Sequence, residues 1–239
     1  LPCKNEEEAL GECLQSIKRV LKENKIKGEI IVSDSSTDSS PEIAKKNKVK
    51  LIKHDKDGYG NAYLEAFKIA KGKYLFLADS DGSYDFNEIP MFLKCLREGY
   101  DLVIGNRLNG NIDKGSMPWH HRYIGNPLLS WILRLFFKTN VKDAHSGMRA
   151  IRKDVLEDLN LRASGMEFAS EMIMKAARAN LKIREIVINY HSRKGESKLK
   201  SFSDGWRHLR FMLLYAPKFL FLMPGMLLFT LGILSMALI

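Results

Sequence analysis

The sequence predicts an α/β fold in which a mostly parallel sheet is flanked by helices, followed by an interfacial helix and a C-terminal transmembrane helix. Three observations support this prediction. Short β-branched or aliphatic runs alternate with helical patterns along residues 1–200. Acidic residues follow some of these runs, at the strand ends where parallel sheets usually bind their ligands. Residues 219–239 form an apolar segment that carries no charge.

Five runs are predicted to be strands because they are aliphatic or β-branched and several are followed by Gly, Asp or Ser. They cover residues 29–32, 49–52, 74–78, 102–105 and 183–188. Leu1 and Pro2 resemble the end of a further strand. Since helical patterns separate these runs, we expect most of the strands to be parallel.

Helices are predicted over residues 6–21, 61–70 and 86–96. In the first of them, apolar residues from Ala9 to Val20 share one face, as a helix packed on a sheet requires. Asn5 and Glu8 have the spacing of a capping box, so we expect the Asn5 side chain to cap this helix.

The C-terminal residues are predicted to bind a membrane. The segment 219–239 approaches the roughly 20 apolar residues that span a bilayer as a helix. The segment 201–218 mixes aromatic residues such as Trp206 with basic residues such as Arg207, as an interfacial amphipathic segment does. The positive-inside tendency then makes residues 1–200 one cytoplasmic domain. Because the chain begins at Leu1 without methionine and stops inside the apolar segment, we expect sequence to be missing at both ends.

The composition limits the class of partner. A net charge of +10 and a pI near 9.4 suit nucleic acid, nucleotide phosphates or an anionic membrane surface. Many of the lysines lie in two runs, KRVLKENKIKG and AKKNKVKLIK, which have the pattern of ordinary solvated surfaces. The three cysteines lack the spacing of a zinc site and the even count of a disulfide framework, and so fit a reducing, cytosolic setting.

The segment KYLFLADSDGSYD contains the strongest functional signal. An apolar run ends in Asp79 and Asp81, followed by Gly82, which permits a tight turn. Two carboxylates at a strand end suit Mg²⁺ or Mn²⁺, which fill their other positions with water and phosphate oxygens. The pair therefore predicts a phosphorylated substrate, although acidic residues after a strand are also common turn formers.

Two further segments suggest a nucleotide. Asp34 ends the predicted strand before SDSSTDSS, where it could accept a hydrogen bond from a nucleobase or simply belong to a turn. In DGYGNA, Gly60 permits close backbone approach to a nucleotide, or merely a tight turn. Neither a Walker loop nor a Rossmann GxGxxG motif is present in the sequence.

The order of these motifs resembles family 2 of the inverting glycosyltransferases, which have the GT-A fold. The matching pieces are LPCKNEEEAL, VSDSSTDS, DGYGNAYLEAF, the Asp79-Ser80-Asp81 signature and IGNRLNG. Further along, KDAHSGMRAIRKDVLEDL and the segment around SRKGESK resemble the branch that glycosylates polyprenyl phosphates. That branch includes dolichyl-phosphate mannose synthases and polyprenyl-phosphate glucosyltransferases.

The resemblance implies a role for particular residues of this chain. The nucleotide-binding residues it implies, with Gly60 added, are Pro2, Glu6, Asp34, Gly60, Asp79 and Ser80. Asp81 would bind the metal together with Asp79, while Ser83 stands where such enzymes often have Gln or His. The phosphate-binding residues would be Arg107, Arg122, Arg193 and Lys198. The catalytic set would be Asp81, Arg107, Arg122, Asp143 and Arg193.

Two of these assignments have alternatives. Asp143 could orient the cations, act as a general base or simply form a turn, and Arg122 could equally be ordinary surface charge. His120 and His121 have the pattern of packing or surface residues rather than metal ligands.

The implied function is metal-dependent transfer of a hexose from a nucleotide sugar to dolichyl or undecaprenyl phosphate. The donor would be UDP-glucose, UDP-N-acetylglucosamine or GDP-mannose. The reaction would occur at the cytoplasmic face of the cell membrane, or of the endoplasmic reticulum membrane in a eukaryote. A homo-oligomer would be compatible with this function.

Two other functions compete with this one. The first is extension of a saccharide, but the only glutamine is Gln15, so the Gln-x-x-Arg-Trp motif of processive synthases is absent from the sequence. The second is a non-catalytic, membrane-tethered protein that binds nucleotide sugars or polyanions. Nucleic acid is not an expected partner, because the sequence shows neither clustered base-stacking aromatics nor a recognition element.

Overall fold

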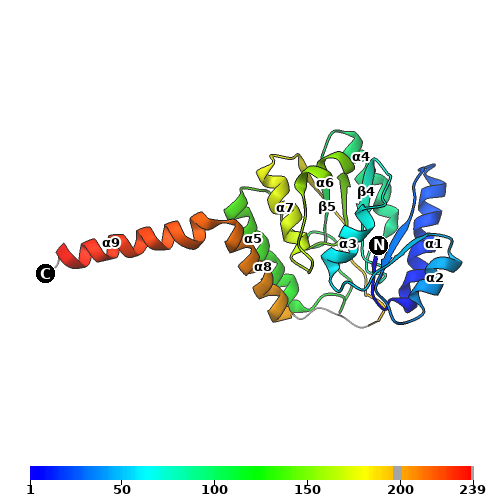
Figure 1. The fold of residues 1–239 in the computed structure, drawn as a ribbon, viewed down its shortest axis with the longest axis horizontal. Helices are drawn as coiled ribbons and strands as arrows, with labels where there is room; N and C mark the ends of the chain where they lie inside the picture. The colour runs from blue at the N-terminus through cyan, green and yellow to red at the C-terminus, as the bar shows by residue number, and fades with distance from the viewer. Residues whose placement is uncertain (196–200, 238–239) are drawn as a thin grey trace.

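The computed structural model describes residues 1–195 and 201–237 and has an α/β fold (Figure 1). The strands are β1 Pro2–Cys3, β2 Ile31–Asp34, β3 Lys50–Lys53, β4 Tyr74–Leu77, β5 Leu102–Asn106, β6 Arg149–Arg152 and β7 Ile183–Val187. The first α-helices are α1 Glu7–Glu23, α2 Ser40–Lys46, α3 Tyr59–Phe67, α4 Ile89–Arg97 and α5 Asn126–Phe137. The later ones are α6 Lys153–Leu159, α7 Phe168–Arg178, α8 Ser201–Tyr215 and α9 Met223–Ala237. Short turns η1 Phe86–Glu88, η2 His121–Gly125 and η3 Lys218–Leu222 precede α4, α5 and α9.

The strands form two sheets. The first is parallel, in the order β1-β2-β3. The second has the order β4-β6-β5-β7, in which β6 is antiparallel to both neighbours and β5 is parallel to β7. All five predicted strands are present within two residues of their expected limits, and the predicted α/β class is confirmed. The sequence prediction missed β6 because its four residues, RAIR, hold only two apolar side chains between two arginines and form no apolar run.

The second sheet separates two hydrophobic cores. On β5, Leu102 and Ile104 face a core shared with α3, α5, α6, α7 and α8. Val103 faces the opposite core, which α1 and α4 complete. This alternation follows from the two-residue period of a strand and buries β5 on both faces.

The predicted capping box at the start of α1 is wrong. The N-cap residue of α1 is Glu6, and its side chain makes no capping hydrogen bond. Asn5 instead adopts a positive φ of 53°, and its Oδ1 accepts a hydrogen bond of 2.8 Å from the backbone N–H of Thr37. Asn5 therefore ties the segment after β1 to the loop after β2.

The C-terminal helices differ in their environment. The α8 helix buries His208 and Met212 and exposes Trp206 and Leu214, and Ala216, directly after it, is buried as well. The α9 helix projects away from the rest of the chain (Figure 1). Within the described residues, the helix Lys218–Met236 is long and apolar enough to cross a membrane, and none of its apolar window is buried. It begins in the π-type turn η3, next to Pro224, which has no N–H to donate to the preceding turn.

Candidate active site

Asp79 and Asp81 lie just beyond the carboxyl end of β4, on the turn that leads to η1. Gly82 has a φ of 81°, the left-handed conformation that glycine adopts at low cost, so the chain can reverse directly after the second carboxylate. This turn is held against β1, because Ser80 Oγ donates a hydrogen bond of 2.6 Å to the Pro2 carbonyl.

Asp81 is buried and held in a fixed orientation. Its Oδ1 accepts hydrogen bonds from the Ser83 N–H at 3.0 Å and from Ser83 Oγ at 2.6 Å. Its Oδ2 lies 3.6 Å from Nη1 of Arg193, whose Nη2 is 3.5 Å from Oε1 of Glu6. Ser83 therefore orients one oxygen of Asp81 and leaves the other facing a cation that belongs to the segment after β7.

The Asp79 carboxyl has unused hydrogen-bonding capacity. Its buried Oδ1 has no hydrogen-bond partner among the residues that the structure describes. Burial, followed by the nearby charge of Asp81, raises the pKa of Asp79 from its usual 3.8 to about 7. A buried carboxylate oxygen without a donor, next to a second carboxylate, gains stability from a bound cation.

Gly147 sits so close to Asp79 that a side chain would collide with the carboxylate. A Cβ built on Gly147 would lie 2.6 Å from Asp79 Oδ2. The same glycine donates its N–H to Tyr84 Oη at 2.7 Å, so the loop that carries it is fixed in place. Sequence reasoning could not single out Gly147, because its role depends on a contact with Asp79, which is distant in the sequence.

We expect Gly147→Ala to displace the Asp79 carboxylate and to lower turnover by roughly a hundredfold, as a misplacement of about 1 Å can. The overpacking should also reduce stability by about 1 to 3 kcal/mol. Sugar transfer and thermal unfolding measured on the same preparation test both expectations. Gly205→Ala, on α8 where an added Cβ meets nothing within 4 Å, is the control. Wild-type turnover in Gly147→Ala would show that this contact does not position Asp79.

The two carboxylates fit a hard divalent cation that other ligands complete. Among the described residues, no group of three or more His, Cys, Asp or Glu side chains could hold a metal alone. Mg²⁺ and Mn²⁺ commonly bind through one or two carboxylates and take water and substrate phosphates as further ligands. The unpartnered Oδ1 of Asp79 and the Oδ2 of Asp81 supply that donor set. Ser83 is engaged with Asp81, consistent with its departure from the Gln or His of similar enzymes.

The predicted nucleotide residues surround the same strand ends. Asp34 ends β2 and is fully buried; its Oδ2 has no hydrogen-bond partner in the described part of the chain. Pro2 lies on β1 and pairs with Ser33 of β2 in the sheet. Gly60 is explained by packing, since a Cβ there would lie 2.0 Å from the Ala163 carbonyl oxygen. Its contact with a nucleotide stays a prediction.

Arg107 and Asp143 form a buried, bidentate ion pair. Nε and Nη2 of Arg107 donate to the two oxygens of Asp143 at 2.9 and 2.8 Å, and the Arg107 backbone N–H adds a bond of 3.0 Å. The exposed fractions of the two side chains are 8% and 0%. The guanidinium also lies over the Tyr190 ring, 5.2 Å from its centroid. Burial acts to lower the pKa of Arg107, but the charge and hydrogen bonds of Asp143, together with Tyr84 and Tyr190, outweigh it and raise the pKa well above its usual value.

The loop that carries Asp143 and Gly147, called the active-site loop below, is held by Arg149. This buried guanidinium donates to three backbone carbonyls, those of Ala144, Ser146 and Ala169. Burial without a carboxylate in direct contact lowers its pKa. Sequence reasoning missed this role, since the DAHSGMR segment gives no sign that its arginine points inward.

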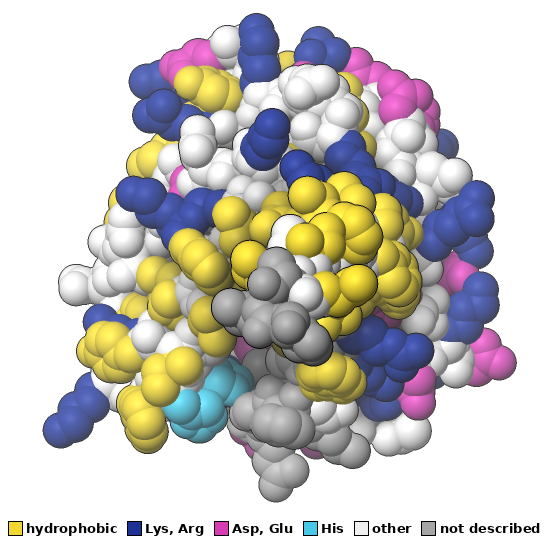
Figure 2. All heavy atoms as spheres, turned by 90° about the vertical axis from the view of Figure 1, so that its left-hand side faces the viewer, with side chains coloured by type: hydrophobic (Ala, Val, Ile, Leu, Met, Phe, Trp, Pro, Cys, Tyr) yellow, Lys and Arg dark blue, Asp and Glu magenta, His cyan; other side chains and the backbone are white. Residues whose placement is uncertain are grey.

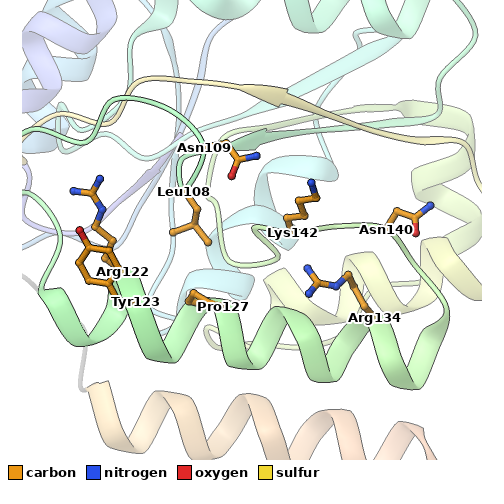
Figure 3. Close-up of a pocket in the computed structure, with 8 residues that line it drawn as sticks. All are labelled: Leu108, Asn109, Arg122, Tyr123, Pro127, Arg134, Asn140 and Lys142. Carbon is orange, nitrogen blue, oxygen red and sulfur yellow. The ribbon is translucent and has the colours of Figure 1, made fainter.

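A pocket of about 700 Å³ is lined in part by Leu108, the residue that follows Arg107 in the chain (Figure 3). Leu108 and Asn109 line it from the loop after β5, and Arg122 lines it from η2. At its far end, Arg134 of α5 lies beside Lys142 of the loop before β6. Three cationic side chains thus face one pocket. The sequence prediction included Arg122 and missed the other two, which have no motif.

The structure therefore groups the predicted residues in two places. Asp79, Asp81, Glu6 and Arg193 lie together beyond β4, and the charge of Arg107, which pairs with Asp143, also acts on Asp79; Arg122 lines the pocket. Lys198 lies outside the described residues.

The chain is similar to known glycosyltransferases. Residues 1–159 match the family model described as "Glycosyl transferase family 2". The low-salt glycan biosynthesis hexosyltransferase Agl6 of Haloferax volcanii is 47% identical over 239 residues, which is all of this chain. The chain spans only 58% of the length of that relative. The dolichyl-phosphate hexose transferase of the same organism is 31% identical over 201 residues, covering 84% of this chain and 85% of that protein.

Solved structures share the fold. Glucosyl-3-phosphoglycerate synthase from Mycobacterium tuberculosis, in complex with Mn²⁺, UDP and glucosyl-3-phosphoglycerate, superposes with a TM-score of 0.71. The match covers 90% of this chain and 78% of that one at 18% sequence identity. At that identity the likeness establishes the architecture alone.

Proposed function

The chain belongs to glycosyl transferase family 2, and from this premise we propose that it transfers a hexose from a nucleotide sugar to a polyprenyl phosphate. The donor is UDP-glucose, UDP-N-acetylglucosamine or GDP-mannose, and the acceptor is dolichyl or undecaprenyl phosphate. One observation carries the proposal: the pair Asp79 and Asp81, with Arg193 beside it, occurs in the same domain as a cationic pocket lined by α5, whose Phe136 stacks on Phe219 of the candidate membrane helix.

The donor side of the site would be built on strand ends. Asp34 offers an unpartnered, buried Oδ2 to a nucleobase N–H. Pro2, on the neighbouring strand β1, and Glu6, which follows that strand, would complete the nucleoside site. Asp79 and Ser80 would meet the ribose and diphosphate region. A divalent cation held by Asp79 and Asp81 would supply positive charge to the diphosphate. Arg193, 3.6 Å from Asp81, would add a second positive group where negative charge grows as the glycosidic bond breaks.

On the acceptor side, the nucleophile would be a phosphate oxygen. A phosphate monoester with its second pKa near 6 is largely dianionic at neutral pH, so it needs no general base. The oxygen would bond to the anomeric carbon while the bond from that carbon to the diphosphate breaks, its electron pair leaving with the nucleoside diphosphate. One displacement inverts an α-linked donor to a β-linked product.

The protein would position this phosphate with cations. Arg122, Arg134 and Lys142 line the pocket, and Asp143 fixes Arg107, which directly precedes the lining residue Leu108. Both oxygens of Asp143 accept hydrogen bonds from Arg107, which supports a role for Asp143 in orienting that guanidinium rather than as a base.

The surface beside the pocket suits a membrane interface. On η2 and α5, Ile124, Leu128, Trp131 and Leu135 are exposed at helical spacing, and each is about half accessible to solvent. Trp206 of α8 is exposed as well. Figure 2 shows hydrophobic side chains gathered around α9 with Lys and Arg side chains at their margin. Exposed tryptophans next to an apolar helix and basic residues are typical of membrane interfaces, which would bring a lipid phosphate to the pocket.

The test is release of nucleoside diphosphate by the full chain in detergent with Mn²⁺ or Mg²⁺. A panel of UDP and GDP sugars is supplied with and without a polyprenyl phosphate. We expect release that requires the lipid phosphate and one donor. Release without lipid that a saccharide stimulates would instead assign extension of a glycan, and no release with any pair would contradict a catalytic role.

A further inference from the structure

A second pocket, of about 660 Å³, lies at the ends of α1 and α2, remote from the carboxylates. Six lysines line it: Lys18, Lys22, Lys25, Lys27, Lys48 and Lys50. They come from two runs that are separate in the sequence. The runs meet because β2 and β3 are parallel neighbours, with Ile31 paired to Lys50, so the segments that enter both strands lie at one edge of the sheet.

The two runs have the same local structure. After α1 the chain reads Asn24-Lys25-Ile26-Lys27, and after α2 it reads Asn47-Lys48-Val49-Lys50. Each asparagine side chain donates to a backbone carbonyl of the last helical turn, and the lysine that follows has a φ of 51°. This left-handed conformation costs about 1 kcal/mol for a residue with a Cβ, and glycine or asparagine tolerates it better.

Lysine at these positions is not required by the turn itself. Asparagine takes the same conformation at the end of α6, in Asn160, and after α7, in Asn180, whereas α5 ends on Lys138. The attraction between a lysine ammonium and the partial negative charge at a helix C-terminus accounts for part of the preference for lysine. It does not account for the convergence of both lysine turns on one pocket.

Most of the charge at this pocket is uncompensated. Lys18 donates to the Asn47 carbonyl, and Lys50 pairs with Glu29. Lys22, Lys25, Lys27 and Lys48 are exposed, and within the described residues none of them has an ion-pair partner. Between them lie partly exposed aliphatic side chains, those of Leu21, Ile26, Ile30 and Val49.

We propose that this pocket docks an acidic segment of a partner protein, with aliphatic side chains on the floor and carboxylates against the four free lysines. The charge pattern and the apolar floor together select this occupant. Neither an arginine nor an aromatic ring is among the described residues that line the pocket, so bidentate phosphate contacts and base stacking are not provided. The helices α1 and α2 lie at the opposite end of the molecule from α9, away from the candidate membrane span (Figure 1).

The test is binding of a fluorescently labelled peptide of glutamate and leucine to the full chain in a non-ionic detergent, measured by anisotropy. The variant is Lys25→Asn with Lys48→Asn, because asparagine keeps the left-handed turns while removing both charges. We expect its affinity for the peptide to fall about tenfold at low salt. The matched control is Lys138→Asn with Lys114→Gln, which makes the same charge change outside the pocket.

Three results would overturn the proposal. One is no saturable binding of the peptide, and another is an equal loss of affinity in the control. The third is tighter, pocket-dependent binding of a labelled single-stranded oligonucleotide, which would assign the pocket to nucleic acid. We expect sugar transfer to be unchanged in the variant, since these lysines lie outside the proposed active site; the inference does not rest on that activity.

Discussion

Replacing Asp81 by asparagine should lower turnover by on the order of a thousandfold or more while the protein stays folded. The amide oxygen can still accept the two hydrogen bonds from Ser83, so the turn after β4 is retained. What is lost is the negative charge that faces Arg193 and that would bind the cation. Turnover, with Mn²⁺ titrated into each variant, measures the effect.

Asp85→Asn is the matched control. Asp85 lies four residues further along the same turn and accepts a hydrogen bond from the Asn87 N–H at 2.9 Å, which the amide oxygen can also accept. We expect Asp85→Asn to retain near-wild-type turnover. Wild-type activity in Asp81→Asn, or activity that survives complete chelation of metal, would remove Asp81 from the mechanism.

The Asp81→Asn variant should also change the pH dependence of metal binding. In the wild type the pKa of Asp79 is about 7, raised first by burial and then by the charge of Asp81. Below that pH the proton competes with the cation, so apparent affinity for Mn²⁺ falls as pH decreases from 8 to 6. In Asp81→Asn the like charge is gone, so the pKa of Asp79 decreases and this dependence moves to lower pH. Mn²⁺ binding followed by electron paramagnetic resonance distinguishes the two profiles.

Asp143→Asn should be the most destabilising single polar substitution in the active-site loop, by about 3 to 5 kcal/mol. The change leaves the buried Arg107 guanidinium without its counter-charge and sets an amide N–H₂ against its donors. For a chain of this size the unfolding midpoint should fall by roughly 10 °C. Thermal unfolding in detergent measures it.

Two variants separate stability from activity. Asp154→Asn disrupts an exposed pair with Arg152 and should leave the midpoint nearly unchanged. The double variant Arg107→Met with Asp143→Leu replaces the buried pair by apolar groups and should recover much of the stability. It should remain inactive, because the Arg107 guanidinium proposed to position the acceptor phosphate is missing. A midpoint for Asp143→Asn equal to that of Asp154→Asn would contradict a structural role for the pair.

Local chemistry made much of the fold predictable. The apolar runs of β2, β3, β4, β5 and β7 and the amphipathic face of α1 are properties of consecutive residues. The short strand β6 was not predictable in this way, since its arginines are accommodated by partners elsewhere: Arg149 by backbone carbonyls and Arg152 by Asp101 and Asp154. The prediction that Asn5 caps α1 was wrong for a similar reason, because the Thr37 N–H donates to the Asn5 side chain instead.

The site was predictable where it has a motif. The spacing of Asp79 and Asp81 and the segment that contains Arg193 stood out in the sequence, and the structure brings Asp81 and Arg193 within 3.6 Å. Gly147, Arg134 and Lys142 did not stand out, because their positions relative to Asp79 and to the pocket exist only in three dimensions. The meeting of the two lysine runs at one pocket was not predictable either, because it depends on the pairing of β2 with β3.

The burial of α8 determines where this chain can be shortened. His208 of α8 and His145 of the active-site loop share the hydroxyl of Ser170, and burial lowers the pKa of both imidazoles. Met212 is fully enclosed. Cutting the chain before α8 would expose the apolar side chains that α8 covers, so we expect the shortened protein to aggregate. A water-soluble version should therefore retain residues through Ala216 and remove only the apolar helix that follows.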